Sequence, residues 1–210
     1  MTSKARVLAW VVSVAVVAAA AAWNVQLLAD WRRESAAASR ATRAADSLEA
    51  HTRSTRERAL VERLRREARS QPGVALAIDL DSAHLTLLRD GLVLRRLPVT
   101  LGAATAQADA QALGRGAFEV ATVLGPKDRW EVPAWLFTER GLPVPETTAI
   151  RGALGVAAVR LSDGPWIYAL PTVGPLADST YTMPGAIRAK AKDLASVTPN
   201  VTVGTPVYIF

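Results

Sequence analysis

The sequence has 210 residues, of which 50% are hydrophobic, and it contains no cysteine. That length accommodates one packed domain with an additional segment, and the lack of cysteine excludes disulfides, thiolate chemistry and cysteine-based metal sites. The net charge of +6 comes from residues 1–71, which carry 13 Lys or Arg against 7 Asp or Glu, whereas residues 72–210 carry 12 of each. A nucleic-acid site needs basic residues on a folded surface, so this distribution argues against nucleic acid and fits anionic lipid headgroups or an acidic partner better.

The chain opens with a basic leader, residues 1–6, followed by an apolar run without any charge, residues 7–28. As a helix this run would span about 26 to 33 Å, so the sequence predicts a transmembrane anchor. A cleaved signal peptide is the alternative, because the leader, the apolar run and small residues at 18–22 also satisfy that pattern. Three tryptophans are the predicted interfacial residues of the anchor: Trp10, Trp23 and Trp31.

Residues 29–71 are predicted to form one long basic helix. Residues 32–70 contain neither Gly nor Pro and are rich in Ala, Arg, Glu and Leu, and Pro72 and Gly73 end the pattern. Its apolar residues are too sparse for a sustained heptad repeat, so a solvated stalk and a helix packed on a partner are equally good interpretations. The arginines after the apolar run favour a cytoplasmic location for this side of a membrane.

The sequence pattern of residues 72–210 is typical of a mainly β domain. The segment "VALAIDLDSAHLTLLRDGLVLRRLPVTLG", residues 74–102, alternates apolar residues around the turn "DSAH" and the turn Asp90-Gly91. Further strands are predicted at "AFEVATVL", "AAVRLS", "WIYAL" and "TPVYIF", a helix at "AIRAKAKDLASV" and a surface loop at 102–116. The predicted fold is therefore a β-sandwich or barrel-like domain with one or two short helices, placed after the transmembrane helix and the long helix.

Side chains that bind metals are scarce. The only histidines are His51, in the charged helix, and His84, in the predicted hairpin. Both are interpreted as exposed polar residues, and Asp79 and Asp81 as turn residues, so the sequence predicts no metal site and no cofactor.

In four segments the domain resembles the L,D-transpeptidases, bacterial cell-wall enzymes that cross-link peptidoglycan stem peptides through a cysteine. The hairpin 74–102 is similar to the first hairpin of the family, "GRGAFEV" to the Gly-x-Phe that follows it, and "VGTPVYIF" to the closing strand. The segment "PGAIRAKAKDL" lies where the family has His-Gly-Cys-Ile-Arg and a short helix. The resemblance covers about residues 74–210 in the expected order.

At the catalytic positions of the family the chain has other residues. The motif cysteine corresponds to Ala186, its companion histidine to Pro184 and the upstream histidine to the vicinity of Tyr168, while Gly185, Ile187 and Arg188 remain. An alanine methyl cannot attack a carbonyl carbon and a proline ring cannot transfer a proton, so the resemblance implies a protein without transpeptidase activity.

The favoured function is therefore an accessory subunit that is anchored in the bacterial cytoplasmic membrane and binds other subunits of a larger membrane complex. The resemblance implies that its β domain lies on the extracytoplasmic side, in conflict with the orientation that the arginines favour. By analogy alone, photosynthetic reaction-centre or antenna complexes and respiratory complexes are the kind of assembly expected. Aromatic residues are the predicted interface anchors: Trp130, Trp135, Phe137 and Trp166. The alternative is a module that binds peptidoglycan peptides without cutting them, with Arg188 and Tyr181 as ligand contacts.

Overall fold

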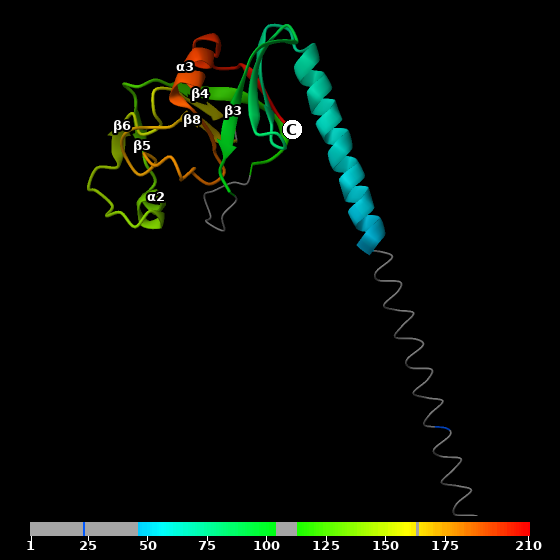
Figure 1. The fold of residues 1–210 in the computed structure, drawn as a ribbon, viewed down its shortest axis with the longest axis horizontal. Coiled ribbons are helices and arrows are strands. Elements are labelled where there is room, and N and C mark those ends of the chain that lie inside the picture. The colour runs from blue at the N-terminus through cyan, green and yellow to red at the C-terminus, as the bar shows by residue number, and fades with distance from the viewer. Residues whose placement is uncertain (1–22, 24–45, 104–112, 163) are drawn as a thin grey trace, which may run out of the picture. The chain divides into compact units, whose positions relative to one another are not determined.

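The computed structural model describes Trp23 and residues 46–103, 113–162 and 164–210. The chain divides into two compact units, Met1–Glu57 and Arg58–Phe210. The described part of the first unit is helical and exposed, with one loose ion pair in which Arg53 lies 3.9 Å from Glu49. The second unit is the β domain, and all the sites described below lie within it (Figure 1).

The prediction that the fold includes an N-terminal transmembrane helix is wrong: no helix of the described residues is long and apolar enough to cross a bilayer. Their longest helix, residues 46–70, has an Arg or Glu at nearly every turn, and such charges are costly in hydrocarbon. The predicted span 7–28, except Trp23, lies outside the described residues, as do Trp10 and Trp31. The mainly β part of the predicted fold is confirmed.

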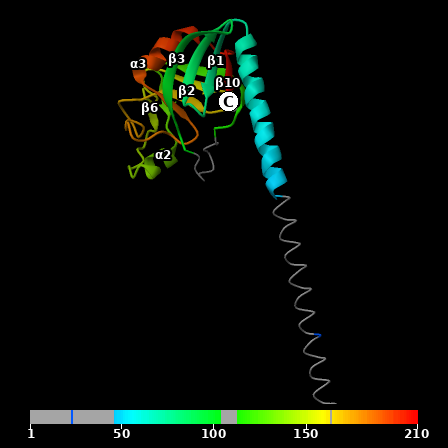
Figure 2. The same cartoon turned by 45° about the vertical axis from the view of Figure 1, so that its right-hand side comes forward.

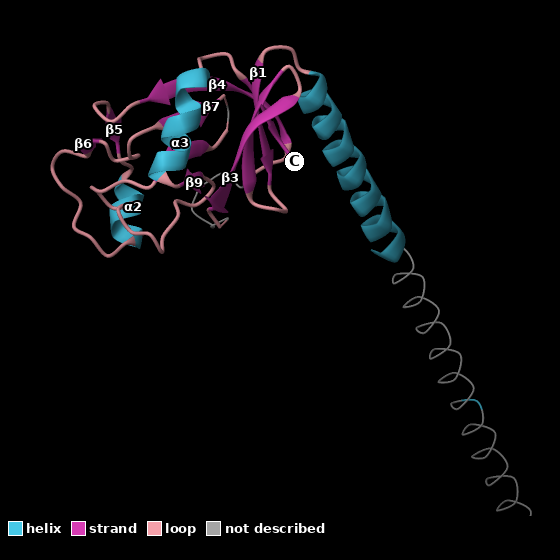
Figure 3. Cartoon of the chain, turned by 45° about the horizontal axis from the view of Figure 1, so that its top comes forward, coloured by secondary structure: helices cyan, strands magenta, loops and turns pink. Residues whose placement is uncertain are grey.

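Eight strands close into a barrel in the order β1-β10-β4-β7-β8-β9-β3-β2. Neighbours pair antiparallel except β1 with β10 and β8 with β9, which are parallel. Two further strands form a separate small sheet, and α2, α3 and the 3₁₀ turn η1 complete the domain (Figure 3). The elements are β1 (Val74–Asp79), β2 (His84–Arg89), β3 (Leu92–Leu101), β4 (Gly116–Leu124), β5 (Arg129–Glu131), α2 (Ala134–Glu139), β6 (Ala149–Arg151), β7 (Ala158–Leu161), β8 (Trp166–Ala169), β9 (Ile187–Ala189), α3 (Ala191–Val197), η1 (Thr198–Asn200) and β10 (Pro206–Ile209).

Strand alternation builds the core of the barrel. Leu76 and Ile78 of β1 point into the barrel together with Val207 and Ile209 of β10, and α3 adds Leu194 and Val197. Because successive strand residues point to opposite faces, the residues between them face outward. These outward residues are buried as well, so another element must cover that face.

The covering element is the end of the long helix, residues 58–70, which lies beside β1 and β10 (Figure 2). Leu64 and Ala68 of the helix pack with Ala75 and Ala77 of β1, and Tyr208 and Phe210 join the same cluster. The small alanines let the helix approach the sheet closely. The helix ends at Ser70, where Pro72 cannot continue it and Gly73 takes a positive φ of 74°.

One sequence prediction differs in detail, because the helix expected over 186–197 begins only at Ala191. Residues 187–189 form β9 instead, which pairs with both β3 and β8. Ile187 and Ala189 are buried in the barrel, so strand pairing overrides the helical propensity of this Ala- and Lys-rich segment.

Candidate functional site

Residues 183–186, where the sequence resemblance places the family motif, form a tight turn that leads into β9. Ala186 N–H donates to the carbonyl oxygen of Met183, 3.1 Å away, and Gly185 has a positive φ of 65°. Proline in the second position and a positive φ in the third are typical of a type II turn. Pro184 and Gly185 therefore fix the backbone at the place where the family resemblance puts a histidine and a glycine.

The turn is closely packed against the end of β3. Gly102 N–H donates to the carbonyl oxygen of Ala186, 2.8 Å away. A Cβ atom at position 102 would lie 1.9 Å from the carbonyl oxygen of Met183, so only glycine fits there. Ala186 itself is 1% exposed, and its methyl group belongs to the second buried cluster of the domain.

Tyr168 supports the same turn from β8. Its side chain is fully buried, and its hydroxyl accepts a hydrogen bond from the Met183 N–H at 3.0 Å. Burial raises the pKa of the Tyr168 phenol, which keeps it neutral. The structure thus brings Tyr168, Pro184 and Ala186 together, and Tyr168 holds the backbone in place as a neutral hydrogen-bonding group.

Arg188 and Tyr181, predicted as ligand contacts, are engaged within the loop before the turn. Arg188 Nη1 donates to the carbonyl oxygens of Tyr181 and Asp178, at 2.6 and 3.1 Å. The Arg140 guanidinium lies 4.6 Å from the centre of the Tyr181 ring and pairs with Asp178. Burial, aided by the Glu139 charge, raises the pKa of Tyr181 well above its ordinary value.

Hydrogen bonds from Thr180, with the Arg140 pair, lower the pKa of the Asp178 carboxyl. Asp178 accepts from the hydroxyl of Thr180 at 2.7 Å and from its N–H at 2.8 Å. The carboxylate is therefore used to shape the loop. Together with Arg188 it fixes the segment 178–182 that precedes the turn.

A pocket of about 330 Å³ opens beside the turn, and we call it the tryptophan pocket. The Trp130 and Trp166 rings meet edge to face with their centres 5.9 Å apart, and the Arg160 guanidinium lies 5.9 Å from the centre of the Trp166 ring. The Trp135 indole Nε1–H is buried without an acceptor. The pocket is lined by Trp130, Pro133, Trp135, Arg160, Gly164, Pro165, Trp166, Met183, Pro184, Gly185 and Ala186.

This lining holds no Cys, His, Ser, Thr, Asp or Glu, and its only charged side chain is that of Arg160. Elsewhere in the described part of the chain, no group of three or more His, Cys, Asp or Glu side chains is arranged to hold a metal ion. The geometry can therefore stack on an apolar ligand, donate a hydrogen bond and attract an anion, but it offers no nucleophile or proton carrier.

Three of the residues predicted as interface anchors line this pocket, and several of the residues around them were not predicted. Trp130, Trp135 and Trp166 are half-buried around the pocket, whereas Phe137 is a core residue that is 5% exposed. Arg160, Met183 and Gly102 were not predicted, because β7, the turn and β3 meet here only through the closure of the barrel. Only the Pro-Gly pair at 184–185 signalled a turn in the sequence.

No protein-family model matches the sequence, and no curated protein matches it. Among solved structures, the chain is similar to an L,D-transpeptidase from Xylanimonas cellulosilytica, with a TM-score of 0.45, 19% identity and coverage of 68% of this chain and 62% of that chain. It is also similar to an L,D-transpeptidase from Mycobacterium smegmatis, with a TM-score of 0.43, 22% identity and coverage of 65% and 58%. A third neighbour, L,D-transpeptidase 1 from Mycobacterium tuberculosis, has a TM-score of 0.42, 20% identity and coverage of 65% and 61%.

The chain thus spans less than two thirds of the length of these solved chains. They are members of the family that the sequence motifs of residues 74–210 resemble, and the likeness at these values concerns the fold alone.

Proposed function

We propose that this chain is a non-catalytic L,D-transpeptidase-like protein that acts as an interaction subunit and binds its partner at the tryptophan pocket. The observation that carries the proposal is the pairing of a buried Ala186 methyl at the motif position with a pocket that has no proton-transferring side chain. The accessory role in a larger assembly of the cell envelope, and the extracytoplasmic location, are parts of the proposal that rest on the sequence resemblance.

Acyl transfer needs a nucleophile activated by a base. Arg160 cannot serve as that base, because a guanidinium stays protonated in proteins. The Tyr168 phenol is buried, its pKa is raised and its oxygen is already bonded to the Met183 N–H. Loss of a nucleophile or its base costs on the order of a millionfold in turnover.

The same pocket is well suited to binding. Tryptophan and arginine are enriched among the residues that dominate protein interfaces, and here three indole rings and one guanidinium share a single cavity. The Arg160 guanidinium, the only charged group of the lining, suits a carbonyl or carboxylate oxygen, which a peptide segment of a partner provides.

The peptide-binding alternative loses support from its two predicted contacts. Arg188 already donates to two backbone carbonyls and Tyr181 packs beneath Arg140. A stem peptide would have to displace these contacts, whereas a partner at the tryptophan pocket would leave them intact.

The test is affinity purification of the tagged full chain at native expression, followed by sizing and mass spectrometry of the proteins that co-migrate with it. We compare wild type with Trp135→Phe, which removes the indole N–H together with part of the ring, and with Trp166→Ala, which removes the stacking face. Leu142→Ala, a change at an exposed residue, is the matched control.

The proposal expects a stoichiometric partner that Trp166→Ala loses, Trp135→Phe weakens about tenfold through lost ring contact, and Leu142→Ala keeps. Circular dichroism spectra of the variants separate lost binding from lost folding. Retention of the partner by both folded tryptophan variants, or saturable binding of a stem peptide that competes with the partner, would refute it.

A further inference from the structure

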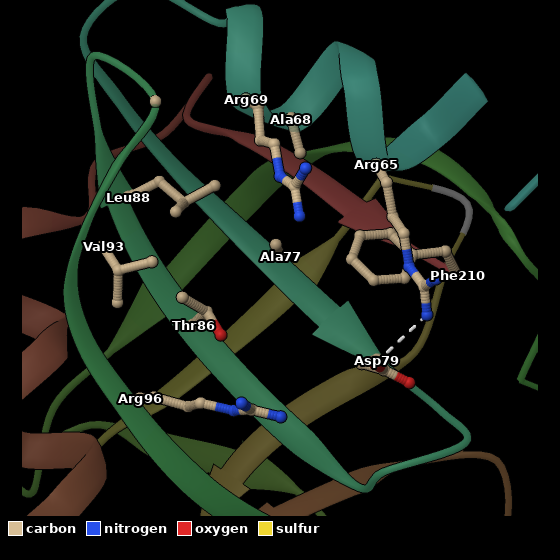
Figure 4. A pocket seen from close by; sticks show the side chains of 11 residues that line it. Arg65, Ala68, Arg69, Ala77, Asp79, Thr86, Leu88, Val93, Arg96 and Phe210 are labelled. Carbon is tan, nitrogen blue, oxygen red and sulfur yellow. Dashed lines mark hydrogen bonds and ion pairs between the residues drawn. The ribbon is translucent and has the colours of Figure 1, made fainter. Parts of the chain in front are cut away.

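A second cavity lies on the other side of the domain, between the helical residues 65–69 and the outer face of β1, β2 and β3 (Figure 4). Its volume is about 290 Å³, and we call it the arginine pocket. It is lined by Arg65, Ala68, Arg69, Ala77, Asp79, Thr86, Leu88, Gly91, Val93, Arg96 and Phe210. The proposed function of the tryptophan pocket makes no use of it.

Three arginines and a single carboxylate line this cavity. Arg65 is engaged, because its guanidinium lies 3.4 Å from Asp79, 3.3 Å from Glu62 and 5.2 Å from the centre of the Phe210 ring. Arg69 points from the helix into the pocket and Arg96 lies on the opposite side (Figure 4). Within the described residues, neither of these two has a carboxylate partner, and the one hydrogen bond of the Arg96 side chain goes to Ser82 Oγ at 3.4 Å.

Backbone contacts hold the two walls of the pocket together. Asp90 N–H donates to the Gly73 carbonyl oxygen at 2.8 Å, and Gly73 N–H donates to Asp90 Oδ1 at 2.7 Å. A Cβ atom on Gly91 would lie 2.0 Å from the Arg69 carbonyl oxygen, so the hairpin touches the helix backbone. The backbone that carries Arg69 and Arg96 is thus fixed before any ligand arrives, which lowers the entropic cost of binding.

The edge of the pocket carries an unusual aliphatic strip, which we define as Leu92, Val93 and Leu94 at the start of β3. Their exposed fractions are 71%, 64% and 50%. A strand with one face on a core normally alternates apolar and polar residues, so three consecutive exposed aliphatics point to a surface that is covered by something else. Arg89, Arg95 and Arg96 flank the strip in sequence.

We propose that the arginine pocket and the aliphatic strip together bind the phosphate group of an anionic phospholipid at a bilayer surface. The guanidiniums of Arg69 and Arg96, which have no carboxylate partner among the described residues, suit phosphate oxygens, to which arginine donates paired hydrogen bonds. The strip inserts into the headgroup and acyl boundary beside them, which explains why apolar and basic residues occur next to one another. A free phosphate would need the arginines only, and would leave the strip exposed.

The test is sedimentation of the full chain with vesicles of phosphatidylglycerol and phosphatidylcholine, measured against vesicles of phosphatidylcholine alone. The neutral vesicles set the baseline for apolar contributions from the rest of the chain. Because the basic residues 1–71 also attract anionic lipid, the pocket variants are compared with a control of equal charge. The expected result is tighter binding to the anionic vesicles, which Arg69→Gln with Arg96→Gln lowers by about 10- to 30-fold. Leu92→Ser with Leu94→Ser is expected to lower binding to the same vesicles by about tenfold or more.

The matched control is Arg129→Gln with Arg151→Gln, which removes the same charge from two exposed residues that pair across β5 and β6. It should change binding by less than about twofold, because these charges lie away from the pocket and are screened. Thermal melting should be equal for all variants, since the side chains of the four test residues are exposed.

Equal losses in the pocket and control variants would overturn the proposal in favour of unspecific charge attraction, and no preference for anionic vesicles would overturn it outright. Titration with inorganic phosphate distinguishes the source of the ligand. Two results together would overturn the lipid proposal in favour of a soluble phosphate ligand. Inorganic phosphate would bind saturably and require Arg69 and Arg96, and the serine substitutions would leave vesicle binding unchanged.

Discussion

Ala186 closes a tight turn whose shape is fixed by its backbone. Proline fixes φ in the second position of the turn, and Gly185 accepts the positive φ of 65° that most side chains avoid. The hydrogen bonds of Ala186 to Met183 and of Gly102 to Ala186 complete the frame. Backbone geometry at this site therefore does not depend on a reactive side chain.

Gly102 provides the first test of this packing. In Gly102→Ala the added Cβ would lie 1.9 Å from the Met183 carbonyl oxygen, so either the turn or β3 must move. We expect a loss of about 1 to 3 kcal/mol in the free energy of unfolding, measured by urea denaturation. Gly114→Ala, where no atom lies within 4 Å of the added Cβ, should change stability by less than about 0.5 kcal/mol. Equal effects of the two substitutions would contradict the close packing.

The buried phenol of Tyr168 makes stability depend on pH in alkaline solution. Its pKa is raised by burial, so unfolded chains release this proton first as the pH rises above about 10. Below about pH 9 this proton should have no effect on the free energy of unfolding. At higher pH its release should lower the free energy of unfolding by at most about 1.4 kcal/mol per pH unit.

Tyr168→Phe should lower stability by about 1 to 3 kcal/mol at neutral pH, because the Met183 N–H loses its acceptor. It should also reduce the alkaline slope, which we would measure by urea denaturation at several pH values. The rest of the slope should remain, because burial raises the pKa of Tyr181 and Tyr208 as well. An unchanged slope in the variant would mean that Tyr168 already ionises in the folded protein.

At the scale of elements, strands β1 and β10 are buried on both faces. Leu76, Ile78, Val207 and Ile209 fill the barrel, while Ala75, Ala77, Tyr208 and Phe210 pack with the helical residues 58–70. The end of the helix is thus part of the core of the domain. An ion pair between Arg65 of the helix and Asp79 of β1, at 3.4 Å, joins the helix to the strand as well.

Leu64→Ala tests this role of the helix. Leu64 is 3% exposed, so its truncation should lower the free energy of unfolding by about 2 to 5 kcal/mol. Leu60→Ala, one turn earlier and 38% exposed, should cost less than about 1 kcal/mol. Chemical denaturation of both variants checks the difference, and a neutral Leu64→Ala would show that the domain folds without the helix.

Local signals predicted many of the elements. The Asp90-Gly91 turn has positive φ at both residues, 51° and 77°, and β4, β7, β8 and β10 lie in the segments where apolar alternation indicated strands. Long-range pairing set the rest: β9 is a strand because β3 and β8 lie on either side of it. The turn of the candidate site was visible in Pro184-Gly185, whereas the meeting of Arg160, Trp135 and Ala186 depends on barrel closure, which single-sequence patterns do not encode.

At the scale of the whole domain, two cavities of different chemistry lie on one barrel. The tryptophan pocket is aromatic and has a single charged side chain, while the arginine pocket has three arginines and one aspartate. Neither contains a nucleophile next to a base. We propose that both act as binding sites, the first for a partner and the second for a lipid phosphate.

Restoring the motif tests whether the scaffold remains competent. In Ala186→Cys with Pro184→His, the new thiol would lie at a position that lines the pocket, beside a potential base. We expect a covalent adduct with a β-lactam, visible by intact-mass spectrometry, and no adduct for Ala186→Ser with Pro184→Ala. If the Cys and His variant folds but forms no adduct, the turn does not expose position 186 to the pocket.

The proposed function requires that the protein carries out no acyl transfer, which a transpeptidation assay of the wild-type full chain measures. The chain is incubated with a stem tetrapeptide donor and an acceptor amine, and cross-linked product and acyl-enzyme are quantified by mass spectrometry. We expect product at the level of the buffer blank and no mass shift of the protein. Product that grows with protein concentration, or an acylated side chain in the tryptophan pocket, would contradict it.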